Sequence, residues 1–407
     1  MPNKSFTLSD SEVDFILSPE AIRDRAAKIF EFTKAGKGKF VFHPEKFEPT
    51  VNYVLDVIRQ NYPGLDIPFH SRWGHFRAGK IDRVKDLDAK LADLDVMERA
   101  RTKLDLVITS VLLDAGAGAA WSYQEGKNSF NRSEGLGVAS YHMFLAGEFS
   151  CDGKSLKADA SGLSRVSGTA LEKAFQVTEK NPLLGVRGRL QLLNNLAQAV
   201  GNKTIFKDGR PGNIVDYLVG KHGNSIPAKA ILRAVLDGLG PIWPGRITAG
   251  MANLGDVWTH PQLGPEGSFA TLVPFHKLSQ WMTYSLIEPI VEAGINVTGV
   301  EGLTGLAEYR NGGLLLDGGL LTLQEPSMAL QAWHPETELV VEWRALTVAL
   351  LDQIGAAVQK SLGKTPQEFP LAKVLEGGTW WAGRYLAQDK RKSGNPPIMI
   401  ESDGTVF

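Results

Sequence analysis

The chain has 407 residues, of which 43% are hydrophobic and 22% charged, and its formal net charge at pH 7 is −1. This length and apolar content suffice to bury a large core, and the lack of excess positive charge excludes nucleic acid as an expected partner. The single cysteine, Cys151, excludes a disulfide framework and a cysteine-rich zinc site.

Neither export nor membrane insertion is predicted. The N-terminal segment MPNKSFTLSDSEVDF mixes acids and hydroxyls and has no apolar signal core. The most apolar run, LVITSVLL, meets Asp114 well before the roughly 20 apolar residues that a membrane span needs. We therefore expect a cytoplasmic protein with no membrane partner.

Most of the sequence follows helical periodicity. Ser18-Pro19 supplies an N-cap hydroxyl and a proline at the first helical position, and an amphipathic stretch over residues 21–32 follows. A second helix is predicted to open at Pro49-Thr50. Further helices are predicted within residues 91–113, 135–145, 170–178, 190–200, 227–239, 278–293, 338–359 and 371–388. The Gly-, Ser- and Lys-rich stretches 150–167 and 201–212 are predicted to be loops.

Strand signals are few. They occur in KFVFHP near Lys39, in GGLLLDGGLLTL from Gly312 and in the C-terminal IMIESDGTVF, where Asp403-Gly404 predicts a hairpin turn. The predicted fold class is mainly α, a large helical domain with a small β element that includes the C-terminal hairpin. A single domain over residues 1–407 is the simpler organisation, and a two-lobed arrangement is the alternative.

Two aspartates stand in apolar, small-residue surroundings, Asp114 in LVITSVLLDAGAGAAW and Asp256 in ITAGMANLGDVW. An ionised carboxylate in such a setting is costly unless a cation or a hydrogen-bond donor meets it. The alternative for each is a structural acid that backbone N–H groups satisfy. The occurrence of two such acids favours a catalytic site, which requires them to share one cleft.

Cationic groups in three segments are candidates for binding an anionic substrate. PFHSRWGHF contains Arg72 and His75, Arg132 lies at an apparent helix start, and Arg310 precedes a predicted turn over residues 311–313. Guanidinium groups bind phosphate in a bidentate manner, and helix N-termini attract anions. Each segment alone is more often a turn with a solvated charge. Together they favour a pocket for a small phosphorylated, hydroxyl-rich molecule.

Common catalytic signatures are missing from the sequence, including the nucleophile elbow, the zincin helix and the phosphate-binding P-loop. A helical chain without alternating strands and helices makes NAD binding improbable, so no cofactor is expected. His70, His75, Asp256 and His260 form an alternative metal set. Because the five-residue spacing of the first two is not a recognised zinc pattern, no metal is predicted.

The runs HSRWGHF, LLDAGAGAAWSY, RSEGLGVAS, GDVWTHP, PFHKLSQWMTYSLIEP, EYRNGGLLLDGG, EGGTWWAGRYLAQDKR and PPIMIESDGTVF follow one another in this order. Together they resemble a fungal and bacterial family of uracil-catabolism proteins long described as a domain of unknown function. The resemblance implies the splitting of a ribosylurea species into urea and a ribose phosphate. More distantly, RITAGMANLGDVW and FHKLSQWMTYSLIEP are similar to segments of queuosine-salvage nucleotide glycosidases, which are helical proteins.

These resemblances, together with the chemistry, imply roles for the acids. Asp256 falls on an active-site acid of the glycosidases and Asp114 on an acid of their base-binding segment, whereas Thr283 replaces their second downstream acid. A carboxylate near the anomeric carbon stabilises an oxocarbenium-like state, activates water or attacks directly, and we assign this role to Asp256. Asp114, Glu301 or His276 is predicted to give the ureido group a proton or hydrogen bonds.

The remaining predicted site residues bind phosphate or form aromatic walls. The phosphate candidates are Arg72, His75 and Arg310, with Arg132, Arg384 and Lys277 behind them. The aromatic candidates are Trp73, Trp121, Trp258, Trp281 and Tyr284, although aromatic residues more often pack in cores. The expected partner is a small phosphorylated sugar or ureido substrate.

Three functions are therefore open. The leading one is hydrolysis of the N-ribosyl bond of a ribosylurea or its phosphate, without a cofactor. The second is phosphoribosyl transfer, although the acidic pair and Gly/Thr phosphate loop of such enzymes are missing from the sequence. The third is non-catalytic binding of a pyrimidine-derived nucleotide.

Overall fold

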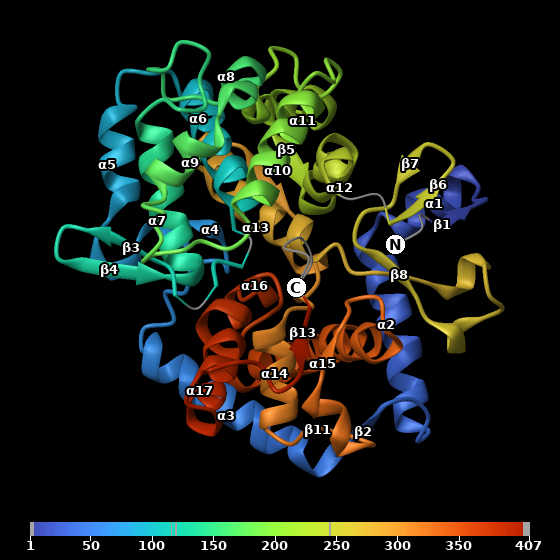
Figure 1. Ribbon diagram of the computed structural model, residues 1–407. Helices are drawn as coiled ribbons and strands as arrows, with labels where there is room; N and C mark the ends of the chain where they lie inside the picture. Colours follow the sequence, from blue (N-terminus) through green and yellow to red (C-terminus); the bar gives the residue numbers. More distant parts are fainter. Residues whose placement is uncertain (1–3, 115, 119, 244–245, 402–407) are drawn as a thin grey trace. The chain divides into compact units, whose positions relative to one another are not determined.

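The computed structural model describes residues 4–114, 116–118, 120–243 and 246–401. The chain divides into two compact units that are each built from separated stretches of sequence. Unit 1 comprises Met1–His70, Gly245–Gln280 and Gly299–Phe407, and unit 2 comprises Ser71–Pro244 and Trp281–Thr298. Helices predominate and the strands form only small sheets, so the predicted mainly α fold is confirmed (Figure 1).

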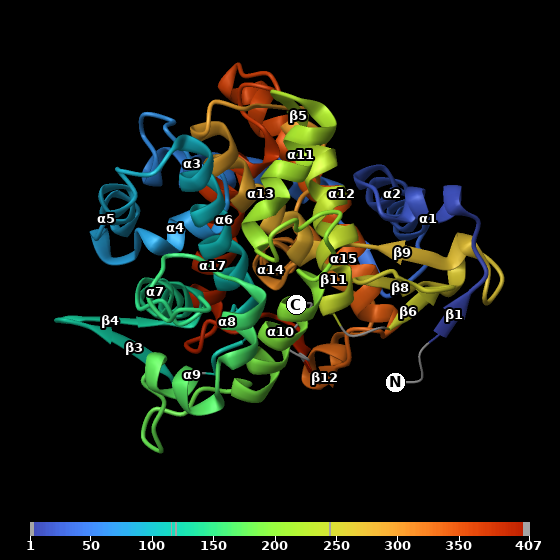
Figure 2. The same ribbon diagram turned by 90° about the horizontal axis from the view of Figure 1, so that it is seen from above.

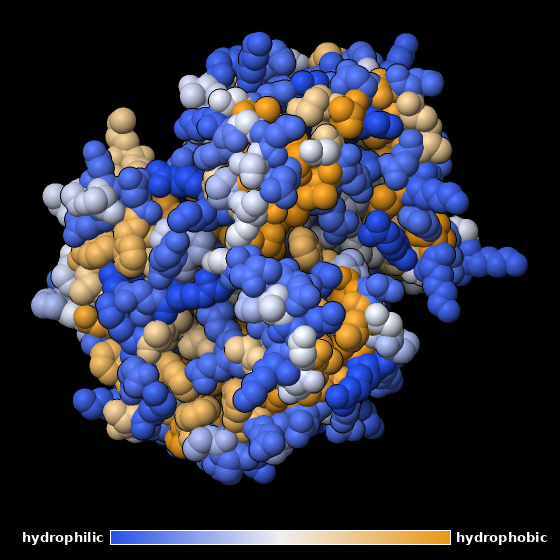
Figure 3. All heavy atoms as spheres, turned by 180° about the vertical axis from the view of Figure 1, so that it is seen from behind, coloured by the Kyte–Doolittle hydropathy of each residue, from blue (hydrophilic) through white to orange (hydrophobic). Residues whose placement is uncertain are grey.

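Polar side chains predominate on the drawn surface. On the face in Figure 3, apolar residues gather in smaller groups between hydrophilic ones. The largest buried side chains include Trp343 in unit 1 and Trp121 and Tyr284 in unit 2. Among the described residues, no helix has both the length and the apolar character required to cross a bilayer.

Helices form the body of unit 1. They are α1 (Asp10–Ile16), α2 (Pro19–Lys34), α3 (Phe47–Asn61), α14 (Tyr309–Asp317), α15 (Glu338–Leu362), α16 (Leu371–Val374) and α17 (Trp380–Lys390), with a π-helical segment at Leu375–Thr379. Ser18 accepts a hydrogen bond from the N–H of Ala21 at 3.2 Å, so α2 opens with the predicted cap. α15 packs against α2, and α14 packs against α17 (Figure 1).

The strands of unit 1 are short and form small sheets. They are β1 (Lys4–Phe6), β2 (Phe40–Phe42), β6 (Ile247–Ala249), β7 (Ala252–Asn253), β8 (Val257–Thr259), β9 (Leu272–Pro274), β11 (Leu321–Leu323), β12 (Ala332–Trp333) and β13 (Met399–Ile400). β8 and β9 are antiparallel, with Trp258 opposite Val273. This pairing brings Asp256, which precedes β8, to the segment that follows β9, where its carbonyl accepts the N–H of Phe275 at 2.9 Å.

Unit 2 is a helical assembly around the apolar helix α6. Its helices are α4 (Arg72–Phe76), α5 (Arg83–Lys90), α6 (Val96–Leu112), α7 (Arg132–Leu145), α8 (Ala160–Arg165), α9 (Gly168–Ala174), α10 (Val186–Ala199), α11 (Ile214–His222) and α12 (Ala228–Leu239), and its strands are β3 (Ser122–Glu125), β4 (Asn128–Asn131), β5 (Ser225–Pro227) and β10 (Asn296–Thr298). α6 packs against α7 and α10 (Figure 2). α13 (Lys277–Glu292) has its first turn, to Gln280, in unit 1 and the remainder in unit 2.

The structure corrects the predicted strand that begins at Gly312. Tyr309–Asp317 is the helix α14, and only Leu321–Leu323 of this run is a strand. The turn predicted over residues 311–313 is wrong for the same reason. A Cβ on Gly312 would lie 2.8 Å from ring atoms of Trp343, so the glycine allows α14 to approach α15 closely.

Two further predictions concern the loop over residues 150–167 and the C-terminal hairpin. Part of the predicted loop 150–167 is helical, since α8 occupies Ala160–Arg165. The hairpin predicted at Asp403-Gly404 lies outside the described residues. In the described part of that segment, β13 pairs in parallel with β12.

Candidate functional site

The carboxylate of Asp256 forms a bidentate ion pair with Arg344 in unit 1. Nη1 of Arg344 lies 2.8 Å from Oδ1 of Asp256, and Nη2 lies 2.7 Å from Oδ2. Oδ1 also accepts the indole N–H of Trp258 at 2.7 Å, and Oδ2 accepts the backbone N–H of Lys277 at 3.0 Å. Four donors therefore occupy the two oxygens, which leaves little acceptor capacity for a substrate.

This environment determines the charge of Asp256. Burial raises the pKa of the Asp256 carboxyl. The charge and hydrogen bonds of Arg344 lower it by more than burial raises it, so the pKa lies well below its ordinary value. Arg344 is fully buried, and its guanidinium lies 4.1 Å from the centroid of the Phe275 ring. The acid is therefore ionised and only weakly basic, and it is the counter-ion of a buried cation.

His276, the residue after Phe275, has an unusual backbone conformation. Its φ is +48°, a left-handed conformation that costs energy for a non-glycine residue and is frequent at functional sites. The carbonyl of Asp256 accepts the His276 N–H at 3.4 Å, and the neighbouring Phe275 and Lys277 N–H groups also bond to Asp256. Asp256 thus fixes the backbone on both sides of the histidine.

The side chain of His276 is buried, and its tautomer follows from its contacts. Nε2 lies 2.9 Å from the carbonyl oxygen of Ile16, and a carbonyl only accepts hydrogen bonds, so the proton resides on Nε2. Nδ1 consequently carries a lone pair, and it has no hydrogen-bond partner among the described residues. Burial lowers the pKa of His276, so the ring is neutral at physiological pH.

Gln280 lies one helical turn after His276, and the sequence analysis did not identify it. Its N–H donates to the carbonyl of His276 at 2.8 Å, and its side chain is fully buried. Neither the oxygen nor the nitrogen of its carboxamide has a partner in the described parts of the chain. Buried polar atoms without partners are rare, and each requires an ordered water, an ion or a ligand to complete its hydrogen bonds. The available signal in the sequence was its position four residues after His276, which places the two on the same face of a helix.

Arg310 lies at the start of α14 in unit 1. Glu308 caps this helix by accepting the N–H groups of Arg310 and Asn311, at 2.7 and 2.6 Å. Nη1 of Arg310 donates to the carbonyl of Gly394 at 2.8 Å, while Nε has no partner in the part of the chain that the structure describes. No carboxylate of the described residues forms an ion pair with this buried guanidinium, which suits it to an anion.

Unit 2 contains a second buried arginine and carboxylate, Arg72 and Asp114. Nη1 of Arg72 lies 3.1 Å from Oδ1 of Asp114. Arg72 also donates from Nε to the hydroxyl of Ser110 at 2.6 Å, and Nδ1 of His75 lies 3.3 Å from Nη1. Burial lowers the pKa of Arg72, although the charge of Asp114 opposes this shift. The guanidinium is fully buried, and these partners use its donors inside the unit.

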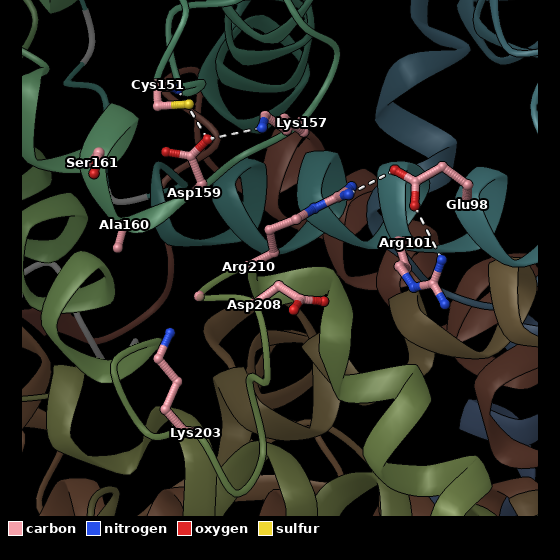
Figure 4. A pocket seen from close by; sticks show the side chains of 11 residues that line it. Glu98, Arg101, Cys151, Lys157, Asp159, Ala160, Ser161, Lys203, Asp208 and Arg210 are labelled. Carbon is pink, nitrogen blue, oxygen red and sulfur yellow. Dashed lines mark hydrogen bonds and ion pairs between the residues drawn. The ribbon is translucent and has the colours of Figure 1, made fainter.

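The described residues also contain a cavity of about 670 Å³ in unit 2 that the sequence analysis did not predict (Figure 4). Arg210 lies 2.6 Å from Glu98, and Lys157 lies 3.4 Å from Asp159. Lys203 extends toward the same cavity from the opposite side. Since most of the charges on its wall pair with one another, the cavity is a weaker phosphate candidate than Arg310.

Comparison with known proteins assigns the family. A family described as "Protein of unknown function (DUF1688)" matches residues 15–407. The chain belongs to the DUF1688 family. It is 36% identical over 440 residues to "Uracil catabolism protein 4" of Lachancea kluyveri, which covers 98% of this chain and 99% of that protein. It is 38% identical over 411 residues to "Protein urg3" of Schizosaccharomyces pombe, and this match covers 98% of this chain and 100% of that protein.

The DUF1688 chain thus carries its two predicted aspartates in different units. Asp256 belongs to unit 1 and Asp114 to unit 2, and each pairs with its own buried arginine. Glu301 is half-buried in unit 1 and accepts a hydrogen bond from Gln367 at 3.1 Å.

Three more of the predicted residues, Arg132, Trp121 and Tyr284, belong to unit 2 of the DUF1688 chain. Arg132 begins α7 with a φ of +52°. Trp121 is buried and donates to the carbonyl of Phe175 at 2.9 Å, and its ring stacks on the Phe175 ring, as expected of a core side chain. Tyr284 is fully buried in α13.

The residues of the alternative metal set have other described partners or belong to the other unit of the DUF1688 chain. His70 pairs with Glu376 at 2.7 Å and Asp256 is bound to Arg344, both in unit 1, whereas His75 belongs to unit 2. His260 has different neighbours, which are described below.

The ion pair leads to a stability prediction for the DUF1688 chain. Asp256→Asn is expected to destabilise the fold by about 3–5 kcal/mol, because it removes the carboxylate charge that pairs with the buried Arg344 guanidinium. Asp256→Asn combined with Arg344→Met is expected to recover part of this loss, as measured by urea unfolding at pH 7. Since the Asp256 pKa is depressed, the stabilisation is present above its ordinary pKa of 3.8 and is lost as pH falls below that value.

An exposed ion pair provides the matched control. Asp56→Asn removes the partner of Arg59, and both side chains are mostly exposed, so the free energy of unfolding is expected to stay close to that of the wild type. Full additivity of the two changes at Asp256 and Arg344 would contradict the proposed coupling.

Proposed function

We propose that this chain hydrolyses the bond between ribose C1′ and the ureido nitrogen of a ribosylurea or its phosphate, as a step of uracil catabolism. The name of the Lachancea kluyveri relative, "Uracil catabolism protein 4", supports the pathway, and the match covers 99% of that protein. The resemblance of two segments to nucleotide glycosidases supports the type of bond. The observation that carries the proposal is the buried, neutral His276 with its lone pair on Nδ1.

In the proposed reaction, His276 is the base. The C1′–N bond breaks with its electron pair going to the ureido nitrogen, and a water oxygen bonds to the oxocarbenium-like C1′. Nδ1 of His276 takes the proton from this water and returns it to the departing nitrogen. One water is consumed, and urea and a ribose or ribose phosphate are formed.

Gln280 is proposed to recognise the ureido group. A carboxamide presents one acceptor and two N–H donors in a plane, and a ureido group presents the complementary carbonyl and N–H groups. Negative charge develops on the ureido oxygen as the C1′–N bond breaks, so a donor that is already fixed by burial stabilises that state. Gln280 is fully buried one turn from His276, which fits a direct role beside the base.

Asp256 has a positioning role in this proposal. The sequence analysis assigns it to the anomeric carbon, but its oxygens already accept four hydrogen bonds. Its bonds to the backbone on both sides of His276 make it the group that orients the base. The roles predicted for Asp114, Glu301 and the residues of unit 2 stay predictions.

Arg310 is proposed to bind the 5′-phosphate when the substrate carries one. It is buried, has no ion-pair partner among the described residues and keeps a free donor at Nε. Ala307, just upstream, accepts a hydrogen bond from Nε of Arg344 at 3.3 Å, so the same segment contacts the Asp256 ion pair. Binding energy from the phosphate then orients the sugar.

The first test of this function is urea release from synthetic ribosylurea and its phosphate. Asparagine tolerates the left-handed backbone of residue 276, so His276→Asn is expected to fold while kcat falls by about 10²–10⁴-fold. The control His334→Asn changes an exposed histidine and is expected to keep full activity. Wild-type turnover with an unimpaired His276→Asn variant would remove the proposed base.

The pH dependence follows from the same residue. Because burial lowers the His276 pKa, the base stays neutral below the ordinary histidine value of 6.5, and kcat/KM is expected to decline only at lower pH. An acid limb centred at or above pH 6.5 would contradict this assignment.

Gln280→Met tests the recognition of the ureido group. The change keeps the volume of the side chain and removes its amide, so kcat/KM for ribosylurea is expected to fall by about 10–100-fold. Gln353→Met alters an exposed glutamine on α15 and is the matched control. Equal kcat/KM values in the two variants would exclude Gln280 from the site.

Arg310→Met tests the phosphate assignment by comparing two substrates. We expect KM for the phosphorylated ribosylurea to rise by at least about 10-fold, because one charge-assisted contact is lost. KM for the unphosphorylated compound should change little. Parallel losses on both substrates would instead indicate a structural role for Arg310.

A further inference from the structure

Three side chains of unit 1 form a cluster that the proposed reaction does not use. His260 follows the last residue of β8, and Glu338 and Glu342 lie one turn apart at the start of α15. One ligand atom from each of the three lies within 4.8 Å of the others. Nε2 of His260 is 3.9 Å from Oε1 of Glu338 and 4.0 Å from Oε2 of Glu342. These separations are too long for hydrogen bonds.

The imidazole of His260 is the most unusual member of the cluster. The residue is only 1% exposed, and neither ring nitrogen has a hydrogen-bond partner within the described residues. A buried imidazole normally bonds through at least one nitrogen. Nε2 instead faces two carboxylate oxygens at nearly equal distances.

The two glutamates also require compensation. Like charges one turn apart on a helix repel, and Glu342 is almost fully buried. The backbone N–H of Lys39 lies 2.9 Å from each oxygen of Glu342, and its ammonium lies 3.5 Å from Oε2 of Glu338. One lysine thus faces two acids. The backbone bond is of the kind that orients a carboxylate ligand of a metal.

We propose that His260, Glu338 and Glu342 bind one divalent first-row transition ion, such as Zn²⁺ or Mn²⁺. One imidazole nitrogen and two carboxylate oxygens suit these ions, and the two glutamate charges neutralise the ion. Bonds of about 2.0–2.2 Å in a tetrahedral arrangement place ligand atoms about 3.4 Å apart, so each histidine–glutamate separation contracts by about half an ångström. Water completes the coordination.

The surroundings provide access and suggest a role. A cavity of about 640 Å³ lined by Thr259, His260, Thr271 and Glu266 reaches the histidine. The ion joins β8, which follows Asp256, to α15, which carries Arg344. It therefore stabilises the framework of unit 1 without contacting the substrate, and the inference does not depend on the proposed reaction.

The test uses the full chain after treatment with a chelator and desalting. Titration with Zn²⁺ is expected to give one site per chain by calorimetry and a Tm that rises with the Zn²⁺ concentration. Glu338→Gln removes the most exposed ligand and is expected to weaken binding by at least about 10-fold. The control Glu336→Gln changes an exposed acid of the same segment and is expected to bind as the wild type does.

Failure of the wild type to bind one ion, or equal affinities of Glu338→Gln and Glu336→Gln, would overturn the proposal. If the Tm of Glu338→Gln is below that of the wild type in the presence of chelator, the substitution itself has destabilised the fold. Pulsed electron paramagnetic resonance of the wild-type chain loaded with Mn²⁺ then tests the site. A nitrogen modulation from a directly bound imidazole supports the site, and its absence overturns it.

Discussion

The ion pair between Asp256 and Arg344 is the constraint on which the candidate site in unit 1 depends. A buried guanidinium requires a counter-ion, and the Asp256 carboxylate meets it in bidentate geometry. The same carboxylate holds Lys277, and the backbone carbonyl of Asp256 holds Phe275 and His276. One residue thus couples β8, the start of α13 and α15. The left-handed conformation of His276 persists because its surroundings fix it from several directions.

Asp114 and Asp256 both occur in apolar, small-residue segments of the sequence, but their environments in the structure differ. Asp256 receives four donors, whereas Asp114 has Arg72 as its described partner. A fully occupied carboxylate serves to hold other groups, and a carboxylate with fewer partners retains acceptor capacity. An isolated acid in an apolar run therefore indicates that a partner exists without revealing whether that partner is protein or substrate.

Much of the fold could be predicted because amphipathic periodicity and caps are local. The Ser18-Pro19 start of α2 is an example, since its cap and first turn lie within a few residues. The strand predicted from Gly312 failed because this glycine serves close packing against Trp343, which lies 31 residues further along the chain. Arg344 carries the same signal as Asp256, a charge in an apolar run, but a partner 88 residues away is not readable from either segment.

The partners of the charged groups in unit 1 bear on the ribosylurea phosphate proposed as the substrate. Asp256 and Arg344 form an ion pair and His276 is neutral, so these three side chains together carry no net charge. The Gln280 carboxamide presents an acceptor and donors that are fixed by burial and complementary to a neutral ureido group. A phosphate instead requires a cation that no protein carboxylate already neutralises, and Arg310 is such a cation among the described residues. A substrate with one uncharged and one anionic end therefore accounts for both groups, whereas an uncharged ligand leaves Arg310 without a function.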